Sequence, residues 1–153
     1  MEQVAPGPAP VNQLPLAGGS VRFARVGPGH GRDLVMLHGL LGSGQQWRAA
    51  AACMGPRFTT WMLELPAISA SSNTSGPRPL SLPGLAAWLG QATAALGLRR
   101  FSLLGSSWGG AVALQFALTA PSALEGLVLV APAHPYWTPS RRQRWLLTPL
   151  GAR

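Results

Sequence analysis

Five residues, Gly105-Ser106-Ser107-Trp108-Gly109, constrain this chain more than any other segment. They follow the apolar run 101–104 and open the run 111–118, which is typical of a helix. A Gly-x-Ser-x-Gly pattern between a strand and a helix predicts a very sharp turn, with the central serine in a strained backbone conformation. Gly105 and Gly109 stand two positions to either side, where Cβ atoms would collide. Ser107 is therefore expected to project from a sheet edge, above the first turn of the next helix.

The rest of the chain predicts strands that alternate with helices. The expected strands are 20–26, 34–37, 58–63, 101–104 and 127–130, and the expected helices are 43–54, 82–96, 108–118 and 140–147. This order favours right-handed crossovers and a mostly parallel sheet. The predicted fold class is therefore α/β, a mostly parallel sheet flanked by helices.

Three segments fall just after expected strands. They are His38-Gly39, Glu64-Leu65-Pro66 and Ser107. Since ligands of parallel α/β sheets bind at the carboxyl ends of the strands, we expect the three segments on one functional rim. His38 is expected to pack the loop there, while the single aspartate, Asp33, is expected at the opposite end of its strand.

A second motif lies upstream, in the segment Leu34-Val35-Met36-Leu37-His38-Gly39-Leu40-Leu41-Gly42-Ser43. It reads as a short buried strand that runs into a His-Gly turn. Together with the segment 105–109, it resembles the α/β-hydrolase family, in the branch with a His-Gly oxyanion loop and a serine nucleophile. The resemblance covers roughly residues 20–150 and implies the core of that fold, truncated before its last strands.

The resemblance also implies the roles of individual residues. Ser107 would be the nucleophile, on the turn called the nucleophile elbow. The backbone N–H of Leu40, which follows Gly39, and that of Trp108 would form the oxyanion hole. Backbone donors impose no side-chain requirement, so a leucine and a tryptophan both serve.

The implied activity is hydrolysis of a carboxylic ester or a related small-molecule acyl substrate, through an acyl-enzyme on Ser107. No cofactor or metal is expected, because the sequence shows no cluster of ligand residues. The segment 37–43 also fits relatives that catalyse C–C cleavage or elimination, so a C–C hydrolase or lyase of the same fold stays open.

A serine hydroxyl needs a base, and in this fold the acid and then the histidine follow the serine along the chain. After Ser107 there is one acid, Glu125, expected on the opposite rim, and one histidine, His134. His134 follows a strand end and is the candidate base that this chain offers, although the segment 131–137 resembles the family's exit into a cap. We expect the acid and histidine to lie outside residues 1–153. A catalytically inactive fragment or a non-enzymatic interaction protein is the alternative.

The domain organisation follows from composition and the same resemblance. Residues 1–18 are rich in Pro, Gly and Ala and are expected to form a disordered or loose arm. Residues 19–153 are expected to be an incomplete α/β-hydrolase core that ends at the start of a cap. The apolar strand 127–130 would then be an edge, through which the chain could self-associate.

Charge, hydropathy and cysteine content limit the classes of binding partner and the cellular location that we expect for this chain. The net charge is +8, but the 12 basic residues are arginines that are scattered apart from Arg99-Arg100 and the segment 141–144, without the aromatic-interleaved basic patch of a nucleic-acid site. Pro121 and Glu125 interrupt the most apolar window, 111–131, so no membrane span is expected. The single cysteine, Cys53, excludes an internal disulfide and fits a cytoplasmic location.

Overall fold

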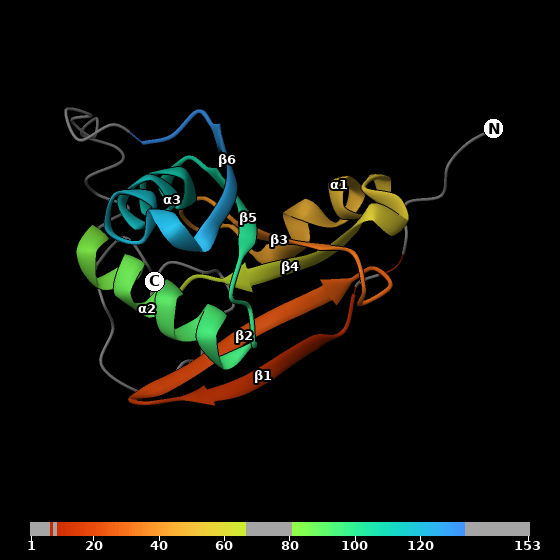
Figure 1. The fold of residues 1–153 in the computed structure, drawn as a ribbon, viewed down its shortest axis with the longest axis horizontal. Coiled ribbons are helices and arrows are strands. Elements are labelled where there is room, and N and C mark those ends of the chain that lie inside the picture. Colours follow the sequence, from red (N-terminus) through yellow and green to blue (C-terminus); the bar gives the residue numbers. More distant parts are fainter. Residues whose placement is uncertain (1–6, 8, 67–80, 134–153) are drawn as a thin grey trace.

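A computed structural model describes residue 7 and the ranges 9–66 and 81–133 (Figure 1). Every strand expected within these ranges is present, as are the helices that follow the strands. The elements are β1 (Val11–Leu16), β2 (Gly19–Val26), β3 (Arg32–Leu37), the 3₁₀ turn η1 (Gly44–Trp47), α1 (Arg48–Cys53), the 3₁₀ turn η2 (Gly55–Arg57), β4 (Phe58–Glu64), α2 (Leu82–Ala95), β5 (Phe101–Ser106), α3 (Trp108–Thr119), the 3₁₀ turn η3 (Pro121–Ala123) and β6 (Leu124–Val130).

The strands form one sheet in the order β1-β2-β4-β3-β5-β6. Strands β4, β3, β5 and β6 are parallel, while β1 and β2 are antiparallel to their neighbours. The predicted mostly parallel α/β sheet is confirmed. From β3 the chain moves to β4 on one side, and from β5 it moves to β6 on the other. The strand order thus reverses between β3 and β5, and this position is where open α/β sheets form a crevice for ligands.

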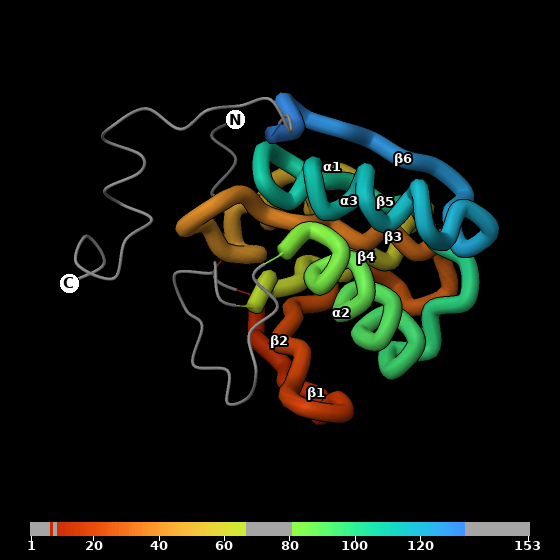
Figure 2. Tube along the Cα trace, turned by 90° about the vertical axis from the view of Figure 1, so that its left-hand side faces the viewer, coloured from red at the N-terminus to blue at the C-terminus, as the bar shows by residue number. Residues whose placement is uncertain are grey.

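Helices cover both faces of the sheet. Helices α2 and α3 pack against each other on one face, and α1 lies on the other (Figure 2). Strand β3 shows how the sequence fits these two layers. Val35 and Leu37 belong to the core beneath α2 and α3, whereas Leu34 and Met36 belong to the core beside α1. A strand buried on both faces is apolar at successive positions, which explains the run 34–37.

The predicted loose arm over residues 1–18 is wrong for β1. This strand pairs antiparallel with β2, from Val11 opposite Ala24 to Leu16 opposite Gly19. Gly18, at φ +85°, allows the tight reversal between the two strands. Leu14 and Leu16 pack against the main core. Pairing and apolar contacts therefore order a segment whose composition alone favours disorder.

The helix expected to begin at Ser43 begins later, and Ser43 makes no side-chain capping bond. The chain first forms η1, and α1 starts at Arg48. The carboxylate of Glu64, on β4, accepts the N–H of Gly44 at 2.8 Å, so an acid from the neighbouring strand and not Ser43 binds the first amide of η1. By contrast, Ser81 caps α2 by accepting the N–H of Gly84 at 3.2 Å. The expected helix 140–147 lies outside the described residues.

Strand β6 is the last strand in the sheet order. Three of its apolar side chains are well exposed among the described residues: Leu127 at 37%, Val128 at 49% and Val130 at 44%. None of the helices in the described ranges is long and apolar enough to cross a membrane.

Candidate active site

Ser107 lies in the turn between β5 and α3, with φ +51° and ψ −118°. A positive φ is rare for a residue with a Cβ atom, and such strain concentrates at functional sites. The serine is exposed, and α3 begins at the next residue. The strained turn expected from the Gly-x-Ser-x-Gly pattern is therefore present.

Hydrogen bonds hold the Ser107 backbone in this conformation. Its N–H donates to the carbonyl of Val130 at 3.0 Å. Its carbonyl accepts the N–H of Ala111 at 3.1 Å and that of Ala133 at 2.8 Å. Residues at and beyond the end of β6 thus supply two of the three bonds. The strain persists because the surrounding structure satisfies both backbone polar groups of Ser107.

The two elbow glycines are required by close backbone approaches. A Cβ atom on Gly105 would lie 2.4 Å from the carbonyl oxygen of Gly109. A Cβ atom on Gly109 would lie 2.4 Å from the carbonyl oxygen of His38 and 2.7 Å from that of Leu37. The first turn of α3 therefore lies directly against the end of β3.

This contact also brings the His-Gly turn to the serine. A Cβ atom on Gly39 would lie 3.2 Å from the Cβ of Ser107 and 3.7 Å from its Oγ. The turn is closed by the N–H of Gly42, which donates to the carbonyl of Gly39 at 3.1 Å, and Leu41 takes up a φ of +57°. The two sequence motifs, far apart along the chain, meet at the carboxyl ends of β3 and β5.

Two backbone donors stand beside the serine without acceptors. Within the ranges that the structure describes, neither the N–H of Leu40 nor that of Trp108 has a hydrogen-bond acceptor. The N–H of Trp108 is at the start of α3, where the first amides have no partner inside the helix and the helix dipole is positive. This arrangement suits a negatively charged oxygen.

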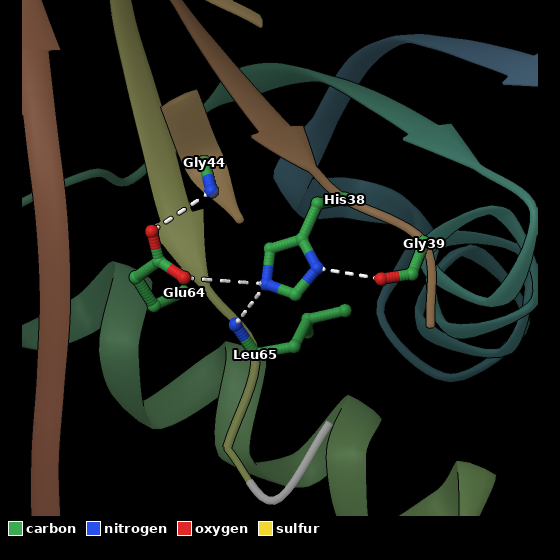
Figure 3. Close-up of polar contacts among 5 residues, drawn as sticks. All are labelled: His38, Gly39, Gly44, Glu64 and Leu65. Atoms are coloured by element: carbon green, nitrogen blue, oxygen red, sulfur yellow. Dashed lines mark hydrogen bonds and ion pairs between the residues drawn. The ribbon is translucent and has the colours of Figure 1, made fainter. Parts of the chain in front are cut away.

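His38 is fully buried behind the His-Gly turn and is held at both ring nitrogens (Figure 3). Its Nε2 accepts the backbone N–H of Leu65 at 2.9 Å. Its other nitrogen, Nδ1, lies 2.7 Å from the carbonyl oxygen of Gly39. Because Nε2 accepts a proton donor, the ring proton is assigned to Nδ1, which donates to Gly39.

Burial lowers the pKa of His38 below its usual 6.5. The hydrogen bond to Gly39 and the charge of Glu64 oppose this shift but are smaller effects. The neutral ring is therefore the favoured form. Oε2 of Glu64 lies 3.6 Å from Nε2, which is too long for a hydrogen bond, and Nε2 already accepts from Leu65.

Glu64 instead acts through the backbone that follows the His-Gly turn. Its Oε1 accepts the N–H of Gly44 at 2.8 Å, and the residue is 7% exposed. The sequence places Glu64 on the functional rim, but sequence reasoning assigned it no partner. The available signal was an acid directly after the apolar strand 58–63, a place where burial requires a hydrogen-bond donor.

The remaining candidate residues lie elsewhere. His134 falls outside the described residues. Glu125 is exposed near the start of β6, at the end of the sheet away from Ser107, as predicted. Asp33 accepts the indole N–H of Trp61 at 2.8 Å. In residues 9–66 and 81–133, no partner is recorded for the Ser107 hydroxyl, and no group of three metal-ligating side chains is found.

Comparison with known proteins places this geometry in a family. The profile of the alpha/beta hydrolase fold matches residues 34–149. The chain belongs to the α/β-hydrolase family. The predicted resemblance to this family is thereby confirmed.

Several relatives carry esterase names. A pimeloyl-(acyl-carrier protein) methyl ester esterase of Aeromonas hydrophila is 37% identical over 103 residues, which cover 67% of this chain and 39% of the relative. The carboxylesterase YbfK of Bacillus subtilis is 30% identical over 124 residues, covering 76% of this chain and 41% of the relative. This chain thus spans about two fifths of these relatives' lengths.

Solved structures support the same fold. The crystal structure of carboxylesterase CesB (YbfK) from Bacillus subtilis superposes with a TM-score of 0.78 at 23% identity. The match covers 90% of this chain and 48% of that one.

A Gly109→Ala substitution is expected to destabilise the chain by about 1–3 kcal/mol, because its Cβ would collide with the carbonyls of His38 and Leu37. Gly90→Ala is the matched control, since it lies inside α2 and its Cβ would meet only a Phe116 ring atom at 3.7 Å. In this control, the free energy of unfolding is expected to rise by about 0.5–1 kcal/mol. Urea unfolding followed by circular dichroism measures both, and equal effects would contradict the packing argument.

The lowered pKa of His38 predicts a loss of stability in mild acid. The unfolded chain binds a proton as the pH falls through 6.5, while the folded chain resists until the pH falls below its own lower pKa. The free energy of unfolding should therefore fall between about pH 7.5 and about pH 5.5. Glu64 is the charged group next to the ring. Its charge opposes the lowering of the pKa of His38, and the net direction is still downward.

Urea midpoints at the two pH values test this expectation. His38→Asn should flatten the pH dependence, because it removes the titrating group. His30→Asn is the control, since His30 is exposed in a turn and should leave the slope as it is in the wild type. An unchanged slope in His38→Asn would show that another group is responsible.

Proposed function

We propose that this chain carries the nucleophile and oxyanion hole of a serine hydrolase that acts on a carboxylic ester or a related acyl substrate. The observation that carries the proposal is the strained, exposed Ser107 together with two nearby backbone N–H groups, those of Leu40 and Trp108, that have no acceptor in the part of the chain that the structure describes. A strained serine supports an attacking group, and unpaired amides support a developing oxyanion.

The proposed reaction has two steps. Ser107 Oγ attacks the substrate carbonyl carbon while its hydroxyl proton passes to a base, and the carbonyl oxygen becomes an oxyanion held by the two amides. The alcohol leaves with the proton, and water then hydrolyses the acyl-serine. The base and its acid are not among the described residues around Ser107. His134 is the candidate base within the chain, and a histidine and an acid outside residues 1–153 are the alternative.

The names of the relatives support an ester as the substrate class, because one hydrolyses a methyl ester and another is named a carboxylesterase. C–C cleavage or elimination would use the same nucleophile position and oxyanion hole, so the reaction subtype is decided by assay. A cytoplasmic location and the lack of nucleic-acid binding stay predictions.

A fluorophosphonate probe is expected to form a covalent adduct on Ser107, located by mass spectrometry of the purified chain. Labelling should be slower than in an enzyme with a complete triad. An oxyanion hole and binding alone leave about 10³–10⁴-fold acceleration over water. Ser107→Ala should abolish the adduct, and Ser106→Ala, one residue earlier on β5, should retain it.

Labelling that survives in Ser107→Ala would move the nucleophile elsewhere, and no labelling of the wild type would favour an inactive protein. Turnover of p-nitrophenyl esters is expected to be low. Turnover close to that of complete relatives, and lost in His134→Ala, would make His134 the base.

We also propose that the isolated chain self-associates through β6. Leu127-Val128-Leu129-Val130 contains neither charge nor proline, and edge strands of this kind recruit other chains. The opposite edge strand, β1, is protected by Pro15, which lacks an N–H, and by polar Asn12 and Gln13.

Light scattering on a sizing column is expected to report dimers or larger species that shift toward monomer in Val128→Lys. Val11→Lys is the matched control, because Val11 is similarly exposed at 43% but lies on β1. A stable wild-type monomer that binds no hydrophobic dye would contradict the proposal.

A further inference from the structure

We propose that His38 is a positioning residue for the oxyanion hole. Its Nδ1–H holds the Gly39 carbonyl at 2.7 Å and thereby fixes the peptide whose N–H belongs to Leu40. This inference rests on the proposed function and assigns a buried side chain to it. His38 itself would touch neither substrate nor nucleophile.

The geometry of the peptide bond carries the first step. The carbonyl of Gly39 and the N–H of Leu40 are parts of one planar unit, and the described residues contain no cis peptide. In a trans peptide the two groups point in opposite directions. When His38 holds the oxygen on its own side, the Leu40 N–H must point away from the imidazole. Gly39, in the His-Gly turn, lies against Ser107, and we infer that the Leu40 donor is thereby held on the side of the serine.

Nδ1 can donate to the Gly39 carbonyl only if the ring proton is on Nδ1. The contact at the other ring nitrogen, Nε2, shows which nitrogen carries that proton. Leu65 donates its backbone N–H to Nε2 at 2.9 Å, and an N–H donor requires an unprotonated nitrogen there. The single N–H proton of the neutral ring is therefore on Nδ1, which donates it to the Gly39 carbonyl. Leu65, immediately after β4, thus selects the tautomer that holds the turn.

The Gly39 oxygen is held a second time, by the N–H of Gly42 at 3.1 Å. A carbonyl that accepts two hydrogen bonds is polarised, and polarisation of a peptide strengthens its own N–H as a donor. His38 therefore acts on both the direction and the donor strength of the Leu40 amide. Glu64 secures the next part of the loop through Gly44, so the turn is fixed before and after Leu40.

Two substitutions separate the two ring nitrogens. In His38→Asn, the side-chain amide nitrogen stands close to the place of Nδ1 and still donates to Gly39. In His38→Gln, the terminal amide stands close to the place of Nε2, so it still accepts from Leu65 but does not reach Gly39. A purely structural histidine would be replaced about equally well by either residue.

The experiment measures fluorophosphonate labelling of Ser107 in the full chain, over a range of probe concentrations. The maximal labelling rate is expected to fall about 10- to 100-fold in His38→Gln, with the half-saturating probe concentration unchanged, because misplacing an oxyanion donor acts on the transition state. His38→Asn should recover most of the rate. His30→Gln, in an exposed turn, is the control for the substitution itself.

A second measurement does not depend on labelling. In ¹³C- and ¹⁵N-labelled chain, the Gly39 carbonyl resonance is expected to move upfield in His38→Gln, where a hydrogen bond is lost, and to stay near the wild-type position in His38→Asn. If His38→Gln does not fold, the Asn variant alone decides. A folded Asn variant with slow labelling and a shifted Gly39 resonance would overturn the proposal.

The two proposals fail in different ways. If the wild type is not labelled at Ser107, the proposed function fails, and the oxyanion role of His38 fails with it. If the wild type is labelled but the Asn and Gln variants are labelled at equal rates, only the role of His38 is overturned.

Discussion

The close contact between the start of α3 and the end of β3 is the constraint on which the site depends. Gly109 allows α3 to approach the carbonyls of Leu37 and His38, and Gly105 allows the chain to reverse from β5 into the helix. A larger residue at Gly109 would push α3 away from the end of β3, and a larger residue at Gly105 would push it away from β5. The same approach forces Ser107 into its positive φ and places Gly39 against it. Strain in one residue is thus maintained by packing and hydrogen bonds among its neighbours.

The order of the strands explains why this contact produces a site. The connections from β3 and β5 leave in opposite directions, and a position of this kind between carboxyl ends is where open α/β sheets bind ligands. The His-Gly turn enters that position from β3, and the elbow enters it from β5. The helix that follows the elbow contributes unpaired amides at its first turn. A backbone site of this kind is rigid, since it is built from strand ends and a helix start.

Buried polar groups then fix the loop that faces the elbow. His38 and Glu64 are both buried, and each is satisfied by backbone N–H groups, from Leu65 and from Gly44 respectively. Neutral His38 avoids the cost of a buried charge, in agreement with the lowered pKa. The network connects the ends of β3 and β4, so the loop geometry depends on sheet pairing as well as on its own sequence.

The sequence by itself determined the elements whose causes are local. The Gly-x-Ser-x-Gly pattern predicts the elbow because steric limits act over five neighbouring residues, and the run 34–37 predicts a strand buried on both faces. Only the tertiary structure decided what depends on distant partners. Strand β1 forms because it pairs with β2. The Pro- and Gly-rich composition of the N-terminus does not predict this pairing.

The partners of His38 and Glu64 were likewise decided by register. Leu37 stands opposite Leu63 in the parallel pair β3–β4, which brings the residues that follow them together. The sequence shows that both residues lie at the ends of strands. It does not show which strands are neighbours or the register in which neighbouring strands pair. The tertiary structure therefore determines the tautomer of His38 and the backbone N–H that Glu64 accepts. Hydrogen bonds between loops depend on the register of the sheet and not on composition.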